Sequence, residues 1–241
     1  MTDAVGRSDR RKDRLYKILR EKGAVRRYVL RRLFPLLERM GIHATADHFY
    51  EIIPNIRELA RDWSDAPRAC TGIDFRAEQA EAWLLRLLGE HGGSFAQAAA
   101  LQGYYEDNSY FRGVDALALF CLLRDWRPRR VIEVGHGFST RVILAALEEN
   151  AKETGVRPSL LSLDPYARFV PERAEGVDFL VVSRGLQDGV NLVTGTLEAG
   201  DLLFVDSTHV HKHGSDVEVY FDSIYPGLAP GVHVHVHDVF S

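Results

Sequence analysis

The stretch Val131-Ile132-Glu133-Val134-Gly135-His136-Gly137-Phe138-Ser139-Thr140 decides the fold of this chain. The apolar run that ends at Val134 predicts a short buried strand. Gly135 and Gly137 permit a tight turn and a close approach of the backbone to a ligand. Ser139 and Thr140 suit the N-cap of a helix over about 140–154, whose first amides would face that ligand. The stretch therefore predicts a strand, a ligand-binding turn and a helix.

From Arg130 onward, short apolar runs alternate with longer helical segments, which is typical of βαβ units and a parallel sheet. The predicted strands are Arg130-Val134, Leu160-Leu163, Phe179-Val182, Leu202-Val205 and Val232-Val236. Helical segments follow at about 140–154, before Asp201 and at about 215–225. The fold class is therefore α/β, with a Rossmann-like, doubly wound, mainly parallel sheet whose strands all end at one ligand-binding edge.

The first half of the chain reads differently. Residues 41–75 form an irregular connection, residues 76–90 carry apolar side chains at helical spacing, and residues 114–125 form a strongly apolar helix. We therefore expect two parts. Residues 1–112 would be a basic helical cap with an irregular lid region, and residues 113–241 would be the sheet domain.

Charge and composition limit the class of protein. The chain has 241 residues and a net charge of −4, yet residues 10–39 carry twelve Lys or Arg and three Asp or Glu. This basic, amphipathic stretch is read as a solvated helical cap, with contact to an anionic membrane left open. No nucleic-acid-binding motif follows it. Without a signal peptide or a long apolar span, the default location is the cytoplasm, where Cys70 and Cys121 stay reduced.

Two features favour a nucleotide-like ligand with a cationic amino-acid part over a dinucleotide. The third glycine of the dinucleotide fingerprint is absent, which disfavours an NAD-dependent oxidoreductase. Glu133, interpreted as facing the ligand edge, suits an ammonium or sulfonium rather than a phosphate. After the second strand, Asp164 can accept both ribose hydroxyls, although a turn cap before Pro165 is the alternative.

The combination of motifs resembles class I S-adenosylmethionine-dependent methyltransferases of the bacterial small-molecule or glycan-modifying type. It comprises Glu133-Thr140, Leu163-Pro165, Leu203-Val210 and Val234-Phe240, with His48-Pro54 and Asn108-Phe111 upstream. The resemblance implies S-adenosylmethionine as cofactor and methylation of a hydroxyl on a small molecule or saccharide. It further implies that the cofactor is bound by Glu133, Gly135, His136, Gly137, Ser139, Thr140, Asp164, Gln187 (or Asp188) and Asp206.

Candidate catalytic residues follow the fourth and fifth strands. Asp206 and His209 come after the fourth strand, and His237 and Asp238 close the fifth. One interpretation is metal-free catalysis in which His237 or His209, oriented by an aspartate, removes a proton. The other is a divalent metal held by Asp206 and Asp238, which is less favoured because an imidazole replaces the expected second carboxylate. The sequence thus predicts no metal ligand.

The remaining histidines and aromatic residues have less specific interpretations. His233, His235 and His237 alternate along the fifth strand and so share one face, with His233 read as structural. His211 and His213 are expected in an exposed loop. Tyr104, Tyr105, Tyr110 and Phe111 either pack a helix onto the sheet or line the acceptor pocket, whereas His48 and Tyr50 are candidate lid residues.

Methyltransferases of this fold normally have two further strands, whereas this sequence ends at Ser241. We therefore expect a domain without the last two strands, whose exposed edge the N-terminal helices or a partner chain would cover. A catalytically silent or truncated cofactor-binding module is the alternative function, and assembly into a homo-oligomer is left open.

Overall fold

Five short strands form one parallel sheet in the computed structural model, which describes residues 32–42, 74–167 and 174–238. Their order is β3-β2-β1-β4-β5. The bounds are β1 (Arg130–Val134), β2 (Ser159–Leu163), β3 (Asp178–Val182), β4 (Leu202–Val205) and β5 (His233–Val236). Strand order reverses between β1 and β4, and ligands of open α/β sheets bind at such a reversal, beyond the carboxyl ends of the strands.

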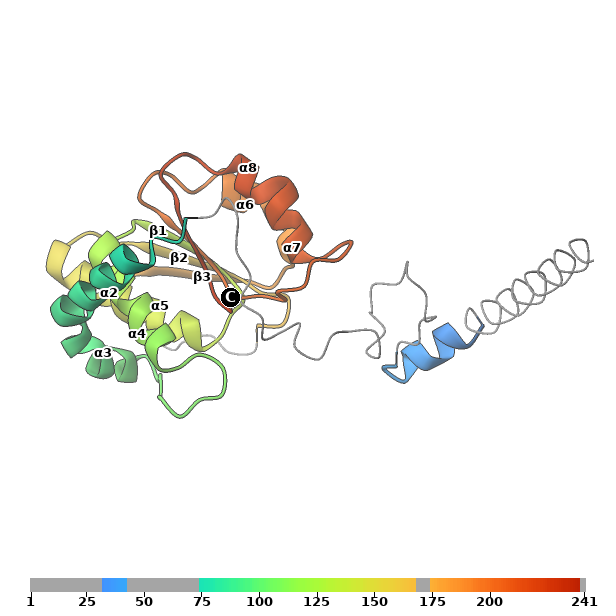
Figure 1. The fold of residues 1–241 in the computed structure, drawn as a ribbon, viewed down its shortest axis with the longest axis horizontal. Coiled ribbons are helices and arrows are strands. Elements are labelled where there is room, and N and C mark those ends of the chain that lie inside the picture. The colour runs from blue at the N-terminus through green and yellow to red at the C-terminus, as the bar shows by residue number, and fades with distance from the viewer. Residues whose placement is uncertain (1–31, 43–73, 168–173, 239–241) are drawn as a thin grey trace, which may run out of the picture. The chain divides into compact units, whose positions relative to one another are not determined.

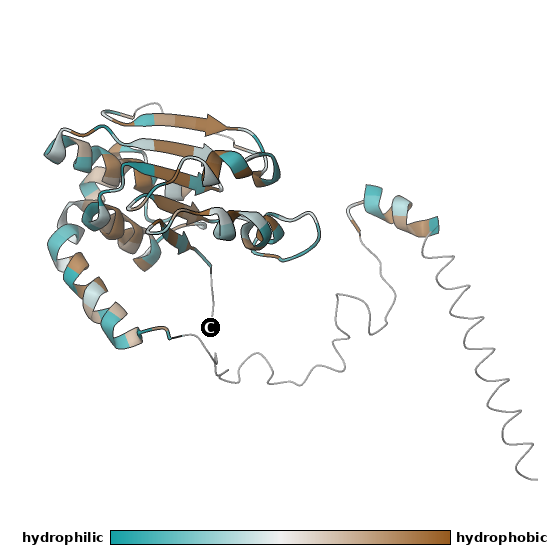
Figure 2. Ribbon diagram, turned by 90° about the horizontal axis from the view of Figure 1, so that it is seen from above, coloured by the Kyte–Doolittle hydropathy of each residue, from teal (hydrophilic) through white to brown (hydrophobic). Residues whose placement is uncertain are grey.

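Helices cover both faces of the sheet, which makes the fold doubly wound and Rossmann-like (Figure 1). One face packs against α4 (Val114–Trp126) and α5 (Phe138–Thr154), with α2 (Ala77–His91), the short η1 (Gly92–Ser94) and α3 (Phe95–Leu101) outside them. The other face packs against η2 (Leu186–Asp188), α6 (Val190–Thr194), α7 (Asp216–Val219), the π-helical turn η3 (Tyr220–Ile224) and α8 (Tyr225–Gly227). Figure 2 shows that hydrophobic residues predominate along the strands.

Two apolar clusters form the core, because alternate strand residues point to opposite faces. Val131, Leu202 and Phe204 point toward α4 and α5, whereas Ile132 and Val205 point toward the second helical layer. All five predicted strands are confirmed, each within one residue of its expected start. The predicted helix over 140–154 begins earlier, at Phe138, because Gly137 is its N-cap and donates its amide to Thr140 Oγ1.

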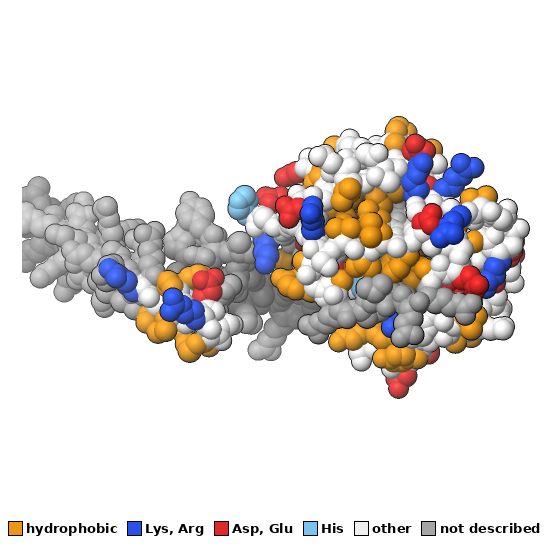
Figure 3. Space-filling model, turned by 180° about the vertical axis from the view of Figure 1, so that it is seen from behind, with side chains coloured by type: hydrophobic (Ala, Val, Ile, Leu, Met, Phe, Trp, Pro, Cys, Tyr) orange, Lys and Arg blue, Asp and Glu red, His pale blue; other side chains and the backbone are white. Residues whose placement is uncertain are grey.

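The chain divides into two compact units, residues 1–69 and 70–241. We expected the division at 112/113, but α2 and α3 pack against α4 and α5 and so share their core. Of the basic stretch at 10–39, the structure describes only residues 32–39, which form a helix. Basic, acidic and hydrophobic side chains lie together on this segment (Figure 3). Across the described ranges, no helix combines the length and apolarity required to cross a bilayer.

Candidate functional site

The glycine turn after β1 lies against the end of β4. Asp206 donates its backbone amide to the carbonyl of Val134, and a Cβ built on Gly135 would lie 1.7 Å from the Asp206 carbonyl oxygen. Gly135 also has a φ of 99°, in the region that side-chain-bearing residues avoid. Only glycine therefore permits this contact between the two central strands.

Asp164, just after β2, fixes the same turn from the other side. Its Oδ2 accepts the backbone amide of His136 at 2.9 Å, and its Oδ1 accepts the amide of Tyr166 at 2.6 Å. The second bond is the turn-capping role considered as the alternative for this residue. Asp164 thus combines the local cap with a position at the ligand-binding edge.

Glu133 does not have the expected orientation toward the ligand edge. As an alternate residue of β1 it points with Val131 toward the α5 side of the sheet, where its carboxylate is 0% exposed. Hydroxyls of Ser139, Thr140 and Ser162 donate to it at 2.7–2.8 Å. Burial raises its pKa to about 7, and the three hydroxyl bonds partly oppose that shift.

A cavity of about 590 Å³ opens beside the turn at the carboxyl edge of the sheet. It brings together four of the predicted cofactor-binding residues, Gly135, Asp164, Gln187 and Asp206. Gln187 also donates its side-chain amide to the carbonyl of Gly214 at 2.9 Å, which ties the loops after β3 and β4 together. Chain segments from four strand ends therefore enclose one ligand-sized space.

The other five predicted cofactor-binding residues, Glu133, His136, Gly137, Ser139 and Thr140, do not line this cavity. They form the hydrogen-bonded support behind the turn. The sequence reasoning, in turn, missed Tyr166 and Asp216, which do line it. Lys212, in the loop that follows β4, also lines it.

The predicted catalytic residues meet next to the cavity. His237 is 8% exposed, and its Nδ1 lies 3.4 Å from Asp206 Oδ1. His209 Nε2 lies 3.3 Å from the same oxygen and 4.0 Å from Asp238 Oδ2. His209 and Asp238 have φ values of 55° and 56°, and such strained backbone is concentrated at functional sites.

A further carboxylate, Asp115, reaches this cluster from the first turn of α4. Its Oδ2 lies 3.6 Å from His237 Nε2, so His237 stands between Asp115 and Asp206. The ring of Phe111 covers His237 at a centroid distance of 4.8 Å. Sequence reasoning missed Asp115 because its position depends on how α4 packs beside β5.

The other β5 histidines face the helical layer. His233 stacks on Trp126 with ring centroids 4.2 Å apart, as a structural residue would. His235 lies against Phe204, and burial lowers its pKa to about 4. His211 and His213 are exposed, as expected.

The aromatic residues before α4 divide into two groups. Tyr104 and Phe111 are buried in the core. Tyr105 and Tyr110 are 56% and 80% exposed, with their rings 5.0 and 6.1 Å from that of Phe138 at the start of α5. The candidate lid residues His48 and Tyr50 lie outside the described residues.

A second, more apolar cavity of about 790 Å³ lies between β5 and the helices α7 to α8. Its walls are mostly apolar, and His209, Asp238 and Ser207 stand at its polar end. Ser207 also lines the first cavity. The two cavities therefore meet at the residue that follows Asp206.

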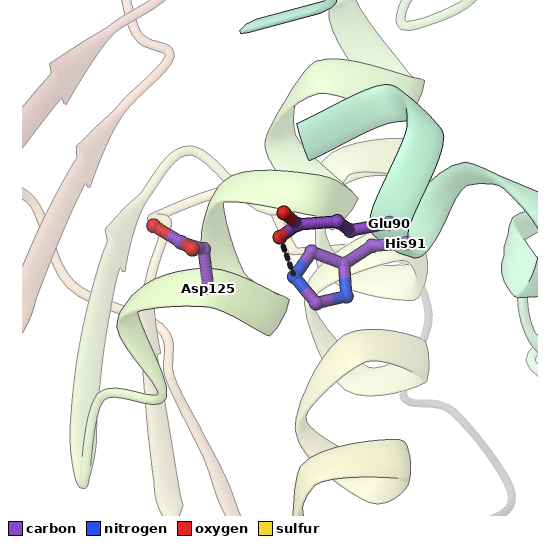
Figure 4. Close-up of side chains that lie close together, drawn as sticks. All are labelled: Glu90, His91 and Asp125. Carbon is purple, nitrogen blue, oxygen red and sulfur yellow. Dashed lines mark ion pairs between the residues drawn. The ribbon is translucent and has the colours of Figure 1, made fainter. Parts of the chain in front are cut away.

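Two groups of side chains in the described part of the chain have the composition of metal ligands. Ligand atoms of Asp206, His209 and Asp238 lie within 4.8 Å of one another. The second group is Glu90, His91 and Asp125, on α2 and α4 (Figure 4). There the guanidinium of Arg86 pairs with Glu90 at 2.7 Å and with Asp125 at 3.4 Å, so both carboxylates already contact a cation.

A family model and two known proteins are similar to parts of this chain. Residues 132–239 match the family model of a methyltransferase domain. An uncharacterized protein of Archaeoglobus fulgidus is 32% identical over 129 residues, which cover 49% of this chain and 57% of that protein. The chain thus spans little more than half the length of this relative. A crystal structure of the Podospora anserina methyltransferase PaMTH1 with bound SAH has a TM-score of 0.37 at 13% identity, over 70% of this chain and 73% of that one.

Proposed function

We propose that this chain is an S-adenosylmethionine-dependent methyltransferase that methylates a hydroxyl of a small molecule or saccharide. The observation that carries the proposal is the cavity at the glycine turn, which lies within the segment matching a methyltransferase domain and next to a cluster of proton-accepting side chains. S-adenosylmethionine would supply the methyl group as an electrophile on its sulfonium.

The cavity-lining residues have the chemistry that this cofactor requires. Asp164 would accept hydrogen bonds from the ribose hydroxyls, and Gln187 would lie near the adenine. Asp206 would favour the positively charged sulfonium and ammonium groups, because an opposite charge at short range is stabilising. Lys212, the cation among the cavity-lining residues, would suit the carboxylate.

The acceptor would lie where the two cavities meet. A hydroxyl there would lie next to His209, which lines the second cavity, and next to Asp206, which contacts His237. One of the two imidazoles would take its proton as the methyl group is transferred. Asp206 contacts both rings and so would hold whichever acts as base. The apolar walls formed by Tyr220, Phe221, Val234 and Val236 favour an acceptor with an apolar body over a saccharide.

Isothermal titration with S-adenosylhomocysteine tests the cofactor assignment. We expect binding by the wild-type chain and at least about tenfold weaker binding by Asp164→Asn, since each lost charge-assisted hydrogen bond costs about 1.5–3 kcal/mol. Asp178→Asn is the matched control, because Asp178 is an exposed carboxylate at the opposite end of the sheet. Absence of binding by the wild-type chain, or equal affinity in both variants, would refute the assignment.

Methyl transfer separates the enzyme from a catalytically silent cofactor-binding module. The chain, incubated with isotopically labelled S-adenosylmethionine and a panel of phenols and saccharides, should label at least one acceptor. His237→Gln should lower kcat by about 10²–10⁴-fold while cofactor affinity changes little. Binding without any labelled product would favour the silent module.

A metal-assisted mechanism is the second candidate, favoured by the proximity of Asp206, His209 and Asp238. These residues would hold a divalent ion that lowers the pKa of the acceptor hydroxyl. Metal analysis of the purified chain, with activity measured before and after chelation, distinguishes the candidates. Metal-free catalysis predicts that activity is unchanged by chelation. Loss of activity on chelation, with recovery on adding Mg²⁺ or Zn²⁺, would favour the metal-assisted mechanism instead.

A further inference from the structure

A continuous set of hydrogen bonds connects the buried Glu133 carboxylate with the ring of His136 in the glycine turn. Ser162 on β2 and Thr140 in the first turn of α5 both donate to Glu133 Oε2, at 2.7 and 2.8 Å. His136 Nδ1 lies 3.0 Å from Ser162 Oγ and 3.2 Å from Thr140 Oγ1. Each link thus contains one hydroxyl between the carboxylate and the imidazole.

The number of protons determines the direction of these bonds. A hydroxyl has a single proton, so Ser162 and Thr140 can only accept at their remaining lone pairs once they donate to an ionised carboxylate. Thr140 Oγ1 does accept the amide of Gly137 at 3.0 Å. His136 Nδ1 therefore faces two acceptors and must carry a proton itself.

We propose that Glu133 is a positioning residue for the glycine turn. Through the hydroxyls of Ser162 and Thr140 it fixes a proton on Nδ1 of His136, and so sets the tautomer and orientation of this ring. The backbone amide of His136 donates to Asp164, and the backbone amide of Gly137 donates to Thr140 Oγ1. Both residues that follow Gly135 are thus anchored, and with them the turn that lines the cavity. The inference deepens the proposed function and depends on it only for the identity of the ligand.

Protonation of Glu133 would reverse the direction of some of these hydrogen bonds. A neutral carboxyl group donates one hydrogen bond, so one hydroxyl would have to accept from it and turn its own proton toward His136. Burial brings the pKa of Glu133 to about 7, and Asp206, just after β4, also raises it. Among the described residues, the other titratable groups at this site are His136 itself, Asp164 at its backbone amide and Asp206, since α5 and β2 contribute hydroxyls to the bonds with Glu133. The turn is therefore sensitive to pH near neutrality.

Nuclear magnetic resonance of the full-length chain with ¹⁵N-labelled histidine tests the inference without any ligand, because the two neutral tautomers have distinct ring ¹⁵N shifts. The His136 signal is assigned from the spectrum of His136→Gln. At pH 9 we expect the Nδ1–H tautomer in the wild-type chain. The Nε2–H tautomer would overturn the proposal, whatever the function of the protein.

The titration of His136 gives a second, independent readout. Glu133→Gln keeps the shape and an acceptor oxygen but removes the charge, so the pKa of His136 should fall by about 0.5–1 unit. In Ser139→Ala, the matched control, the change should be smaller, because Ser139 bonds only Oε1 and lies outside the links to His136. An identical His136 titration curve in wild type and Glu133→Gln would contradict the proposal.

Discussion

Gly135 and Gly137 look alike in the sequence but have different physical roles. A methyl group at position 135 would meet the Asp206 carbonyl at 1.7 Å and would force a side-chain-bearing residue to a φ of 99°. Gly135→Ala should therefore cost about 2–4 kcal/mol of folding free energy and weaken S-adenosylhomocysteine binding at least about tenfold. Urea denaturation and isothermal titration measure the two effects.

Gly137→Ala is the matched control for that substitution. Gly137 has an extended φ of −172°, and its added Cβ would have no neighbour within 4 Å. Its loss of stability should stay near the ~1 kcal/mol typical of alanine at an N-cap. If both alanine variants behaved alike, the contact between the turn and β4 would not be the reason for the glycine.

The buried carboxylate of Glu133 should make folding stability fall as pH rises. Its pKa is raised from 4.5 to about 7 in the folded chain, so the folded state holds a proton that the unfolded state releases between these values. Stability due to this group is full below about pH 4.5 and is lost up to about pH 7, by at most about 3 kcal/mol. Glu133→Gln should lack this decline in urea midpoints measured from pH 4.5 to 7.5, and an unchanged decline would refute the assignment.

At the scale of elements, β5 presents its two histidines, and His237 directly after them, to the helical layer and its valines to the second cavity. Val234 and Val236 are 41% and 37% exposed, whereas His237 is buried. The expected single histidine face is confirmed, since alternation follows from the two-residue period of a strand. That this face is the covered one depends on α4 and Trp126, which no property local to β5 predicts.

His235 should have the opposite effect on stability from Glu133. Burial lowers its pKa from 6.5 to about 4, so its contribution is present above about pH 6.5 and is lost as pH falls toward 4. Its Nδ1 is buried and has no hydrogen-bond partner among the described residues. His235→Leu should remove up to about 3 kcal/mol of acid destabilisation and leave stability at pH 7.5 nearly unchanged or higher. Equal acid midpoints for the variant and wild type would contradict this prediction.

The strands were predictable and the site only partly so. Short apolar runs bounded by turn residues mark buried parallel strands, and their carboxyl ends necessarily meet at one edge, which brings Asp206, His209, His237 and Asp238 together. Asp115 joins them only through the packing of α4 beside β5. For Glu133 a signal existed, since the alternation that points Val131 toward the core also applies two residues later.

For the whole molecule, both apolar clusters of the described residues belong to the unit 70–241. The helix at 32–39 carries the exposed apolar side chains Leu33 and Leu36, at 43% and 56% exposure. We therefore expect a chain of residues 70–241 to unfold in one cooperative transition, with a Tm within about 4 °C of the main transition of the full chain. Its affinity for S-adenosylhomocysteine should change less than threefold, about 0.65 kcal/mol, because every described residue lining the cavity lies after position 133. Calorimetry and isothermal titration on the two chains measure both quantities. A loss of cooperative unfolding would show that residues 1–69 complete the core, whereas intact unfolding with lost binding would assign them to the ligand site.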